Sequence, residues 1–147
     1  MKHCLPVLLA TLVIIGLPQQ TFSRDDRLRF QIDDAMTTVA AQNRLQGIEF
    51  YFGDQKHPEV LKDLGEFYTN KKTNAFAKSD KQACEWVFLS ALMQLQERAR
   101  NLNANAVINI KSYYKYLEFA SETDFECGAG PCLGGVALSG WLGVLAA

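Results

Sequence analysis

The sequence predicts an α+β domain in which a mostly antiparallel sheet packs against one long helix, with a second, shorter helix near the N-terminus. Two observations carry this prediction. A strong helix-start signal at Ser79 opens a long amphipathic stretch, and the segments after that stretch alternate between apolar and polar residues, as strands do. The 147 residues suffice for one domain with an ordinary core, and no internal repeat or low-complexity linker divides them.

Composition and charge exclude several classes of protein. Hydrophobic residues make up 48% of the chain and charged residues 21%, with 15 basic against 16 acidic side chains. These proportions are unlike those of a collagen, a coiled coil or a disordered chain. The formal net charge of −1 is also unlike that of a strongly basic nucleic-acid binder, so we expect no nucleic-acid partner.

Residues 1–23 have the three-part pattern of a secretory signal. A short polar head is followed by an apolar run over residues 4–17 and then by small residues at Thr21 and Ser23. A membrane anchor needs about 20 apolar residues, more than this run supplies. We expect a cleaved signal and a periplasmic or secreted single domain over residues 24–147, without a stable membrane span; a retained anchor is the alternative.

The first half of the mature chain predicts a short helix and two strands. Apolar residues recur at helical spacing over residues 32–40, and two aspartates near the start of this stretch favour a helix N-terminus. The apolar and aromatic residues 48–52 predict a strand. A second strand is predicted over residues 61–68, with a bulge at Gly65, and the polar residues 70–80 are expected to be exposed.

The strongest local signal is a capping box. The Ser79 hydroxyl can accept a hydrogen bond from the Gln82 backbone amide, and the Gln82 side chain can reach back. The residues behind it form a wide apolar stripe, which predicts a helix pressed into the core along most of its length. That stripe consists of Cys84, Val87, Phe88, Ala91, Leu95, Ala99 and Leu102.

Alternating polarity predicts strands over residues 106–117 and 123–127. A hairpin that turns near residues 118–121 would place Lys115 opposite Asp124. It would also set Tyr113 opposite Glu126, Tyr114 against Phe125 and Ser112 against Cys127.

The charge-free residues 133–145 predict a last strand. This strand is either central and buried on both faces, or an edge that pairs with another chain to form a homo-oligomer.

Three of the four cysteines remain after signal cleavage. Cys84 belongs to the buried stripe, and Cys127 points inward if Phe125 does, so we favour a disulfide between them, with Cys132 as a free thiol. Cys84–Cys132 and Cys127–Cys132 are the alternatives. If the unpaired third cysteine has a function of its own, we expect that function to be a redox switch.

Motifs for catalysis, cofactors and metals are lacking in the sequence. His57 is the one histidine of the mature chain, no cysteine or histidine pair has zinc spacing, and neither a phosphate-binding loop nor a nucleophile elbow occurs. We therefore expect no catalytic residue, no metal site and no cofactor. Glu122, Asp124 and Glu126 share one face and are expected to form an exposed carboxylate ladder near Lys111 and Lys115.

Lys111, Tyr113 and Lys115, together with Lys71 and Lys72, form the candidate binding surface. Aromatic rings interleaved with cations can stack on bases or touch polyanionic glycans. The expected partner is an envelope protein or a glycan.

Three segments of the chain resemble the YbjQ/RcsF-like superfamily over roughly residues 60–142. They are Lys-Asp-Leu-Gly-Glu at 62–66, Asn-Ala-Asn-Ala-Val-Ile-Asn at 103–109 and Gly-Gly-Val-Ala-Leu at 134–138. Tyr-Phe-Gly-Asp, Lys-Ser-Asp and Lys-Ser-Tyr-Tyr, which begin at residues 51, 78 and 111, are similar to segments of small exported proteobacterial proteins often labelled excinuclease ATPase subunit. The missing phosphate-binding loop and the signal pattern argue against that label.

The resemblance implies a small α+β fold and one helix-to-sheet disulfide. One branch of the superfamily binds heavy metals and forms rings, and the other is a lipid-anchored envelope-stress sensor with two disulfides. This chain lacks both the metal-ligand set and the lipid-attachment cysteine. The expected function is an exported binding or structural domain that is not an enzyme, associated with envelope interactions or stress; the alternative is a metal- or redox-responsive module.

Overall fold

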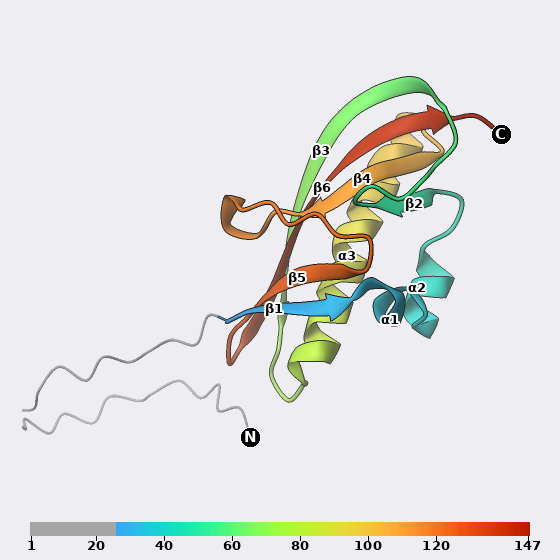
Figure 1. Ribbon diagram of the computed structural model, residues 1–147. Helices are drawn as coiled ribbons and strands as arrows, with labels where there is room; N and C mark the ends of the chain where they lie inside the picture. Colours follow the sequence, from blue (N-terminus) through green and yellow to red (C-terminus); the bar gives the residue numbers. More distant parts are fainter. Residues whose placement is uncertain (1–25) are drawn as a thin grey trace, which may run out of the picture.

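In the computed structural model, which describes residues 26–147, six strands form one sheet that curls into a half-barrel beside a long helix (Figure 1). The predicted signal segment lies outside the described residues. The elements in chain order are β1 (Asp26–Gln31), α1 (Ile32–Met36), α2 (Val39–Arg44), β2 (Glu49–Phe52), β3 (Val60–Asn74), α3 (Asp80–Asn101), β4 (Ala106–Ser112), the 3-10 turn η1 (Tyr114–Tyr116), β5 (Asp124–Ala129) and β6 (Leu133–Leu145).

The sheet is built around β6. One edge of β6 pairs with β3 along its whole length, and the other edge pairs first with β5 and then with β4. β1 extends the sheet from β5, and β2 extends it from β4. Both sides of β6 are hydrogen-bonded to other strands of the same chain, so β6 is the central strand that was predicted. The alternative prediction, an edge strand that pairs with another chain, is wrong.

The α+β class is confirmed, but the expectation of a mostly antiparallel sheet needs correction, because the sheet is mixed. β2 runs parallel to β4, whereas the other ladders are antiparallel. Parallel neighbours need a long crossover connection, and here β3 and α3 together supply it. Local polarity patterns identify a strand but not its neighbour, so this pairing was not visible in the sequence.

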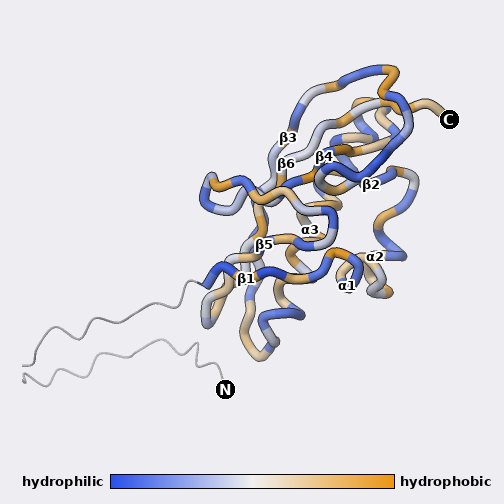
Figure 2. Tube along the Cα trace, in the orientation of Figure 1, coloured by the Kyte–Doolittle hydropathy of each residue, from blue (hydrophilic) through white to orange (hydrophobic). Residues whose placement is uncertain are grey.

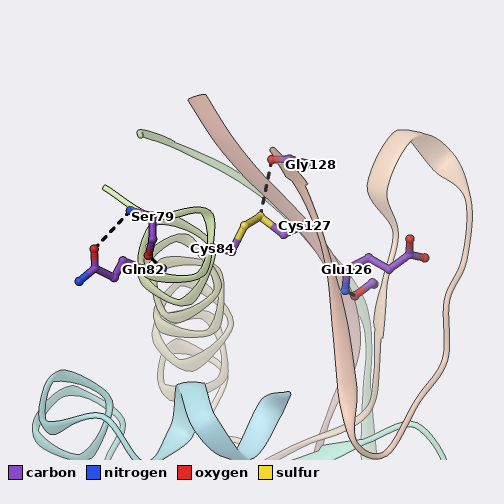
Figure 3. Close-up of a disulfide and its surroundings, with 7 residues drawn as sticks. Ser79, Gln82, Cys84, Glu126, Cys127 and Gly128 are labelled. Carbon is purple, nitrogen blue, oxygen red and sulfur yellow. Dashed lines mark hydrogen bonds between the residues drawn. A yellow bond between two sulfur atoms is a disulfide. The ribbon is translucent and has the colours of Figure 1, made fainter. Parts of the chain in front are cut away.

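The long helix α3 begins at the predicted capping box. The Ser79 hydroxyl accepts from the Gln82 amide at 3.1 Å, and the Gln82 side-chain oxygen accepts from the Ser79 amide at 3.3 Å (Figure 3). Both hydrophilic and hydrophobic residues occur along the whole of α3 (Figure 2). Its apolar side is buried against the sheet. The Phe88 ring of α3 stacks on the Phe125 ring of β5 with centroids 4.1 Å apart, which joins the helix to the sheet.

The N-terminal region differs from the prediction in two ways. Residues 26–31 form β1, a strand that the sequence analysis did not identify, and the predicted single helix is divided into α1 and α2. The division occurs at Thr38, whose hydroxyl accepts from the Ala41 amide at 3.2 Å and caps α2. A threonine hydroxyl can accept a hydrogen bond from a backbone amide at the start of a helix. Threonine is therefore more favourable at the N-cap of a new helix than in the interior of a continuous one.

The strand over residues 61–68 is confirmed and is longer than predicted. β3 continues to Asn74, into the polar segment for which only exposure was expected, because β6 supplies hydrogen-bonding partners along this length. Gly65 has a φ of +100° and lies within a register shift, so the predicted bulge is confirmed. The exposed lysines of β3 suit an edge strand, since charge there discourages pairing with other chains.

The predicted hairpin between residues 106–117 and 123–127 is wrong. β4 ends at Ser112, and β5 pairs with β1, with Phe125 opposite Phe30. The chain between β4 and β5 leaves the sheet instead, so Lys115 does not lie opposite Asp124. One edge of β5 pairs with β1, a strand that was absent from the predicted set. The other edge pairs with β6 at Gly128 and Ala129, and beside it the Glu126 amide donates to the Ser112 hydroxyl at 2.9 Å instead of to a strand.

Gly140 lies where the backbone of β6 packs closely against core side chains. A Cβ at this position would be 2.6 Å from Val107 Cγ1 and 3.3 Å from Ile110 Cγ1. We expect Gly140→Ala to lower the free energy of unfolding, measured with urea, by about 1–3 kcal/mol through overpacking. Gly134→Ala is the matched control, because its nearest neighbour, Ala83 Cβ, is at 3.6 Å. Equal stability of the two variants would contradict this account of β6.

Candidate functional site

A cleft of about 660 Å³ lies beside β3, β6 and the segment that follows β4. Four tyrosines line it, and we call it the tyrosine cleft: Tyr68 comes from β3, and Tyr113, Tyr114 and Tyr116 come from residues 113–118, which we call the tyrosine loop. Successive residues of a strand point to opposite faces. Cys127 of β5 reaches α3 whereas the next residue, Gly128, lies under Tyr114, so the cleft is on the face of the sheet away from α3.

Small residues form the floor of the tyrosine cleft. A Cβ on Gly128 would lie 2.0 Å from Tyr114 Oη, and a Cβ on Gly135 would lie 3.8 Å from Tyr114 Cε2. Only a glycine at position 128 lets the Tyr114 ring lie directly against the strand.

The walls of the cleft are aromatic rings in contact with one another. The Tyr68 and Tyr113 rings have centroids 5.3 Å apart, and the Tyr116 ring meets the Tyr113 ring edge-on at 6.0 Å. Tyr116 is 85% exposed, so its ring extends the aromatic surface into solvent. The cleft therefore brings together one tyrosine from the middle of the chain and three from a region more than 40 residues later.

The tyrosine loop holds a backbone conformation that its residues rarely adopt. Lys115 and Tyr116 have φ values of +52° and +62°, in the left-handed region where a side chain crowds the backbone. Ser112 and Phe119 close the loop with two backbone hydrogen bonds of 3.0 and 2.8 Å, and the Tyr113 amide donates to the Ala137 carbonyl at 2.8 Å. Such strain persists only where surrounding contacts enforce it, and it is concentrated at functional sites.

The electrostatic character of the cleft is mildly positive. Two of its lining residues are lysines, Lys72 and Lys115, and none of the described lining residues is acidic. The pKa of the Tyr68 phenol is raised above its usual value, first by desolvation and then by the nearby Glu66 carboxylate. Tyr68 therefore remains a neutral hydrogen-bonding group throughout the physiological pH range.

The structure keeps part of the predicted binding surface and corrects the rest. Tyr113, Lys115 and Lys72 line the cleft, whereas the ammonium of Lys111 lies 3.4 Å from a Glu118 carboxylate oxygen and does not line it. Tyr114 was expected on the buried face against Phe125 and lies over Gly128 instead. The sequence Tyr-Tyr-Lys-Tyr at residues 113–116 indicated that several tyrosines lie close together. The predicted strand placed alternate residues of this run on opposite faces, but the actual strand ends before the run begins.

The expected exposed ladder of carboxylates does not form. Glu122 is exposed and Asp124 is half-buried, but Glu126 is only 3% exposed. Figure 3 shows the Glu126 side chain on the opposite side of β5 from Cys127 and α3. Its Oε2 atom lies 3.4 Å from Arg27 Nε of β1, so the buried charge is balanced by the strand that the sequence analysis missed.

The Cys84–Cys127 disulfide is confirmed. The two sulfur atoms are 2.10 Å apart, both residues are fully buried, and the bond joins α3 to β5 (Figure 3). Cys132 lines the cleft and is itself disulfide-bonded, and no cysteine among residues 26–147 is free. The expectation of a free thiol at Cys132 is therefore wrong, as are the two alternative pairings with Cys84 and Cys127.

The remaining candidates lie away from the cleft. His57 is exposed, its ring meets the Tyr51 ring at 5.6 Å, and its Nδ1 lies 2.7 Å from the Pro58 carbonyl oxygen. In the described part of the chain, no group of three or more histidine, cysteine or acidic side chains could hold a metal ion. Over the same residues, no helix has both the length and the apolar character needed to cross a membrane.

Comparisons of the chain with protein-family models, with curated proteins and with solved structures found no match. The resemblance to the YbjQ/RcsF-like superfamily accordingly stays a prediction, and the geometry of the tyrosine cleft is the basis for assigning a function.

Proposed function

We propose that this protein is an exported binding domain without enzymatic activity that holds a glycan of the cell envelope in the tyrosine cleft. The observation that carries the proposal is the meeting of four tyrosine rings from two distant parts of the chain around one cleft. A tyrosine combines a flat apolar face with a hydroxyl group and loses little conformational entropy when it binds. Sugar rings have the complementary character, with apolar C–H faces and a rim of hydroxyl groups.

The size and rigidity of the cleft support a ligand site. Its volume of about 660 Å³ falls within the range of about 300–1,000 Å³ that is usual for small-ligand sites. The aromatic walls are held in place before any ligand arrives, by the contact between Tyr68 and Tyr113 and by the closure of the loop at Ser112 and Phe119. A preformed site spends less binding energy on ordering its own side chains.

Export is supported by two independent features. Residues 1–23 carry a secretory pattern, and the described domain contains a buried disulfide between Cys84 and Cys127. Disulfides persist in oxidising compartments such as the periplasm and the extracellular space. In such a compartment the available glycans are those of the cell envelope and its surroundings.

Binding to immobilised peptidoglycan fragments, lipopolysaccharide, polygalacturonate and dextran tests the proposal. We expect the protein to bind at least one of these polymers and Tyr113→Ala to weaken that binding by about tenfold or more. Loss of one aromatic ring that stacks on a nucleic-acid base costs about 1–3 kcal/mol, and we expect a stacked sugar ring to respond similarly. Tyr51→Ala is the matched control, because Tyr51 is a partly buried tyrosine that does not line the cleft.

Gly128→Ala provides a second variant that leaves every ring present but pushes Tyr114 away from the floor. It should also weaken binding if the shape of the cleft matters. The proposal is contradicted if folded protein binds none of the four polymers, or if Tyr113→Ala and Gly128→Ala bind as tightly as Tyr51→Ala.

A further inference from the structure

We infer that the glycan is acidic and that Lys72 and Lys115 recognise its carboxylate groups. This inference rests on the proposed function and adds to it the charge of the ligand. It starts from the charge of the cleft, whose described lining residues include two lysines and no carboxylate.

The two lysines converge on one ring of the cleft although they come from different parts of the chain. Lys72 lies opposite Gly135 in the ladder between β3 and β6, and a Cβ built on Gly135 would lie 3.7 Å from Lys72 Cγ and 3.8 Å from Tyr114 Cε2. The aliphatic stem of Lys72 therefore runs over the glycine floor beside Tyr114. Lys115 Nζ lies 5.6 Å from the centroid of the same Tyr114 ring. A sugar stacked on Tyr114 would have an ammonium group within reach from each lysine.

Two carboxylates lie near the other end of the cleft, at Tyr68, although neither lines the cleft. Glu66 lies two residues before Tyr68 on the same face of β3, and its carboxylate raises the pKa of the Tyr68 phenol. Glu118, the other carboxylate that acts on Tyr68, is within 3.4 Å of the Lys111 ammonium. The cleft thus has a positive end at Tyr114 and a neutral to acidic end at Tyr68. This polarity fits a chain in which an acidic sugar lies next to a neutral, hydroxyl-rich one.

The same charge distribution disfavours a densely charged polyanion. A nucleic-acid binder commonly neutralises about six to ten phosphates, and a single strand places one charge about every 3.4 Å. The cleft offers two lysines, and the whole chain has a formal net charge of −1. A glycan with one carboxylate on some of its rings needs fewer positive charges than a nucleic acid does, and two lysines are enough to pair with it.

The decisive experiment compares hyaluronan oligosaccharides, in which an acidic sugar alternates with a neutral one, with the same oligosaccharides after reduction of each carboxylate to a primary alcohol. The two probes share ring faces and length and differ only at C6 of the acidic sugars, where a carboxylate is replaced by an uncharged hydroxymethyl group. We expect the acidic form to bind about tenfold more tightly at low salt and this advantage to shrink as the ionic strength rises. Lys72→Gln and Lys115→Gln should each weaken binding of the acidic form about threefold to tenfold and leave binding of the reduced form unchanged.

Lys78→Gln is the matched control, since Lys78 is an exposed lysine that does not line the cleft. Equal binding of the acidic and reduced forms, or equal effects of the three lysine variants, would overturn the inference. The proposed function would stand as long as Tyr113→Ala still weakened binding by about tenfold or more. If oligothymidylate binds more tightly than the acidic oligosaccharide, the inference is overturned in favour of a nucleic-acid ligand. Failure of folded protein to bind any glycan of the wider panel would refute the proposed function itself.

Discussion

Replacing Cys84 and Cys127 together with alanine is expected to lower the free energy of unfolding by about 4 kcal/mol. The disulfide closes a loop between residues 43 positions apart, and cross-linking a loop of this length removes much of the conformational freedom of the unfolded chain. Because folded domains are stable by only about 5–15 kcal/mol, the loss is a large fraction of the total. Urea unfolding of the oxidised protein and of the double variant measures it.

The double variant is preferable to either single one, because a single substitution would leave an unpaired cysteine that could exchange with the disulfide of Cys132. Wild-type protein unfolded in the presence of reductant is the control and should lose at least as much stability as the variant. A loss below about 1 kcal/mol would show that the bond is not a principal stabilising link. The bond also bears on the cleft, since Cys127 directly precedes Gly128, on which Tyr114 rests.

Phe88→Ala is expected to lower the free energy of unfolding by about 3–5 kcal/mol. The Phe88 side chain is 1% exposed, stacks on Phe125 of β5 and lies 6.0 Å from the Phe52 ring of β2. Its removal would leave a cavity at the junction of α3 with two parts of the sheet, and close-packed surroundings relax only partly into such a cavity. Thermal or urea unfolding monitored by circular dichroism measures the change.

Phe76→Ala is the matched control for Phe88→Ala, because Phe76 is 55% exposed in the connection before α3. Its replacement should change the free energy of unfolding by no more than about 0.5 kcal/mol. Comparable losses from the two substitutions would mean that the stack between α3 and β5 is not the centre of the core.

Local chemistry made a large part of this fold predictable. The capping box at Ser79 and the apolar stripe behind it depend on residues within a few positions of one another, and α3 forms where they indicate. The bulge at Gly65 and the strand over residues 133–145 have the same local origin. The Cys84–Cys127 pairing could be predicted because each cysteine is placed by the periodicity of its own element.

The candidate site was predictable only in its composition. The sequence places tyrosines and lysines close together at residues 111–116, and it identified Tyr113 and Lys115 as surface residues. It did not show that β4 ends at Ser112 or that Tyr68 and Lys72 would face the same cleft. Those contacts join residues more than 40 positions apart, and no local pattern encodes them.

The sequence by itself determined which segments form helices and strands in most of the domain, where the long helix begins, and that Cys84 is joined to Cys127. Only the tertiary structure decided that β1 takes the edge of β5, that Arg27 balances the buried Glu126, and that the tyrosine loop lies over a floor of glycines. The physical reason is that side-chain periodicity fixes which face of an element is apolar, whereas competition among all strands for hydrogen-bonding partners fixes its neighbours.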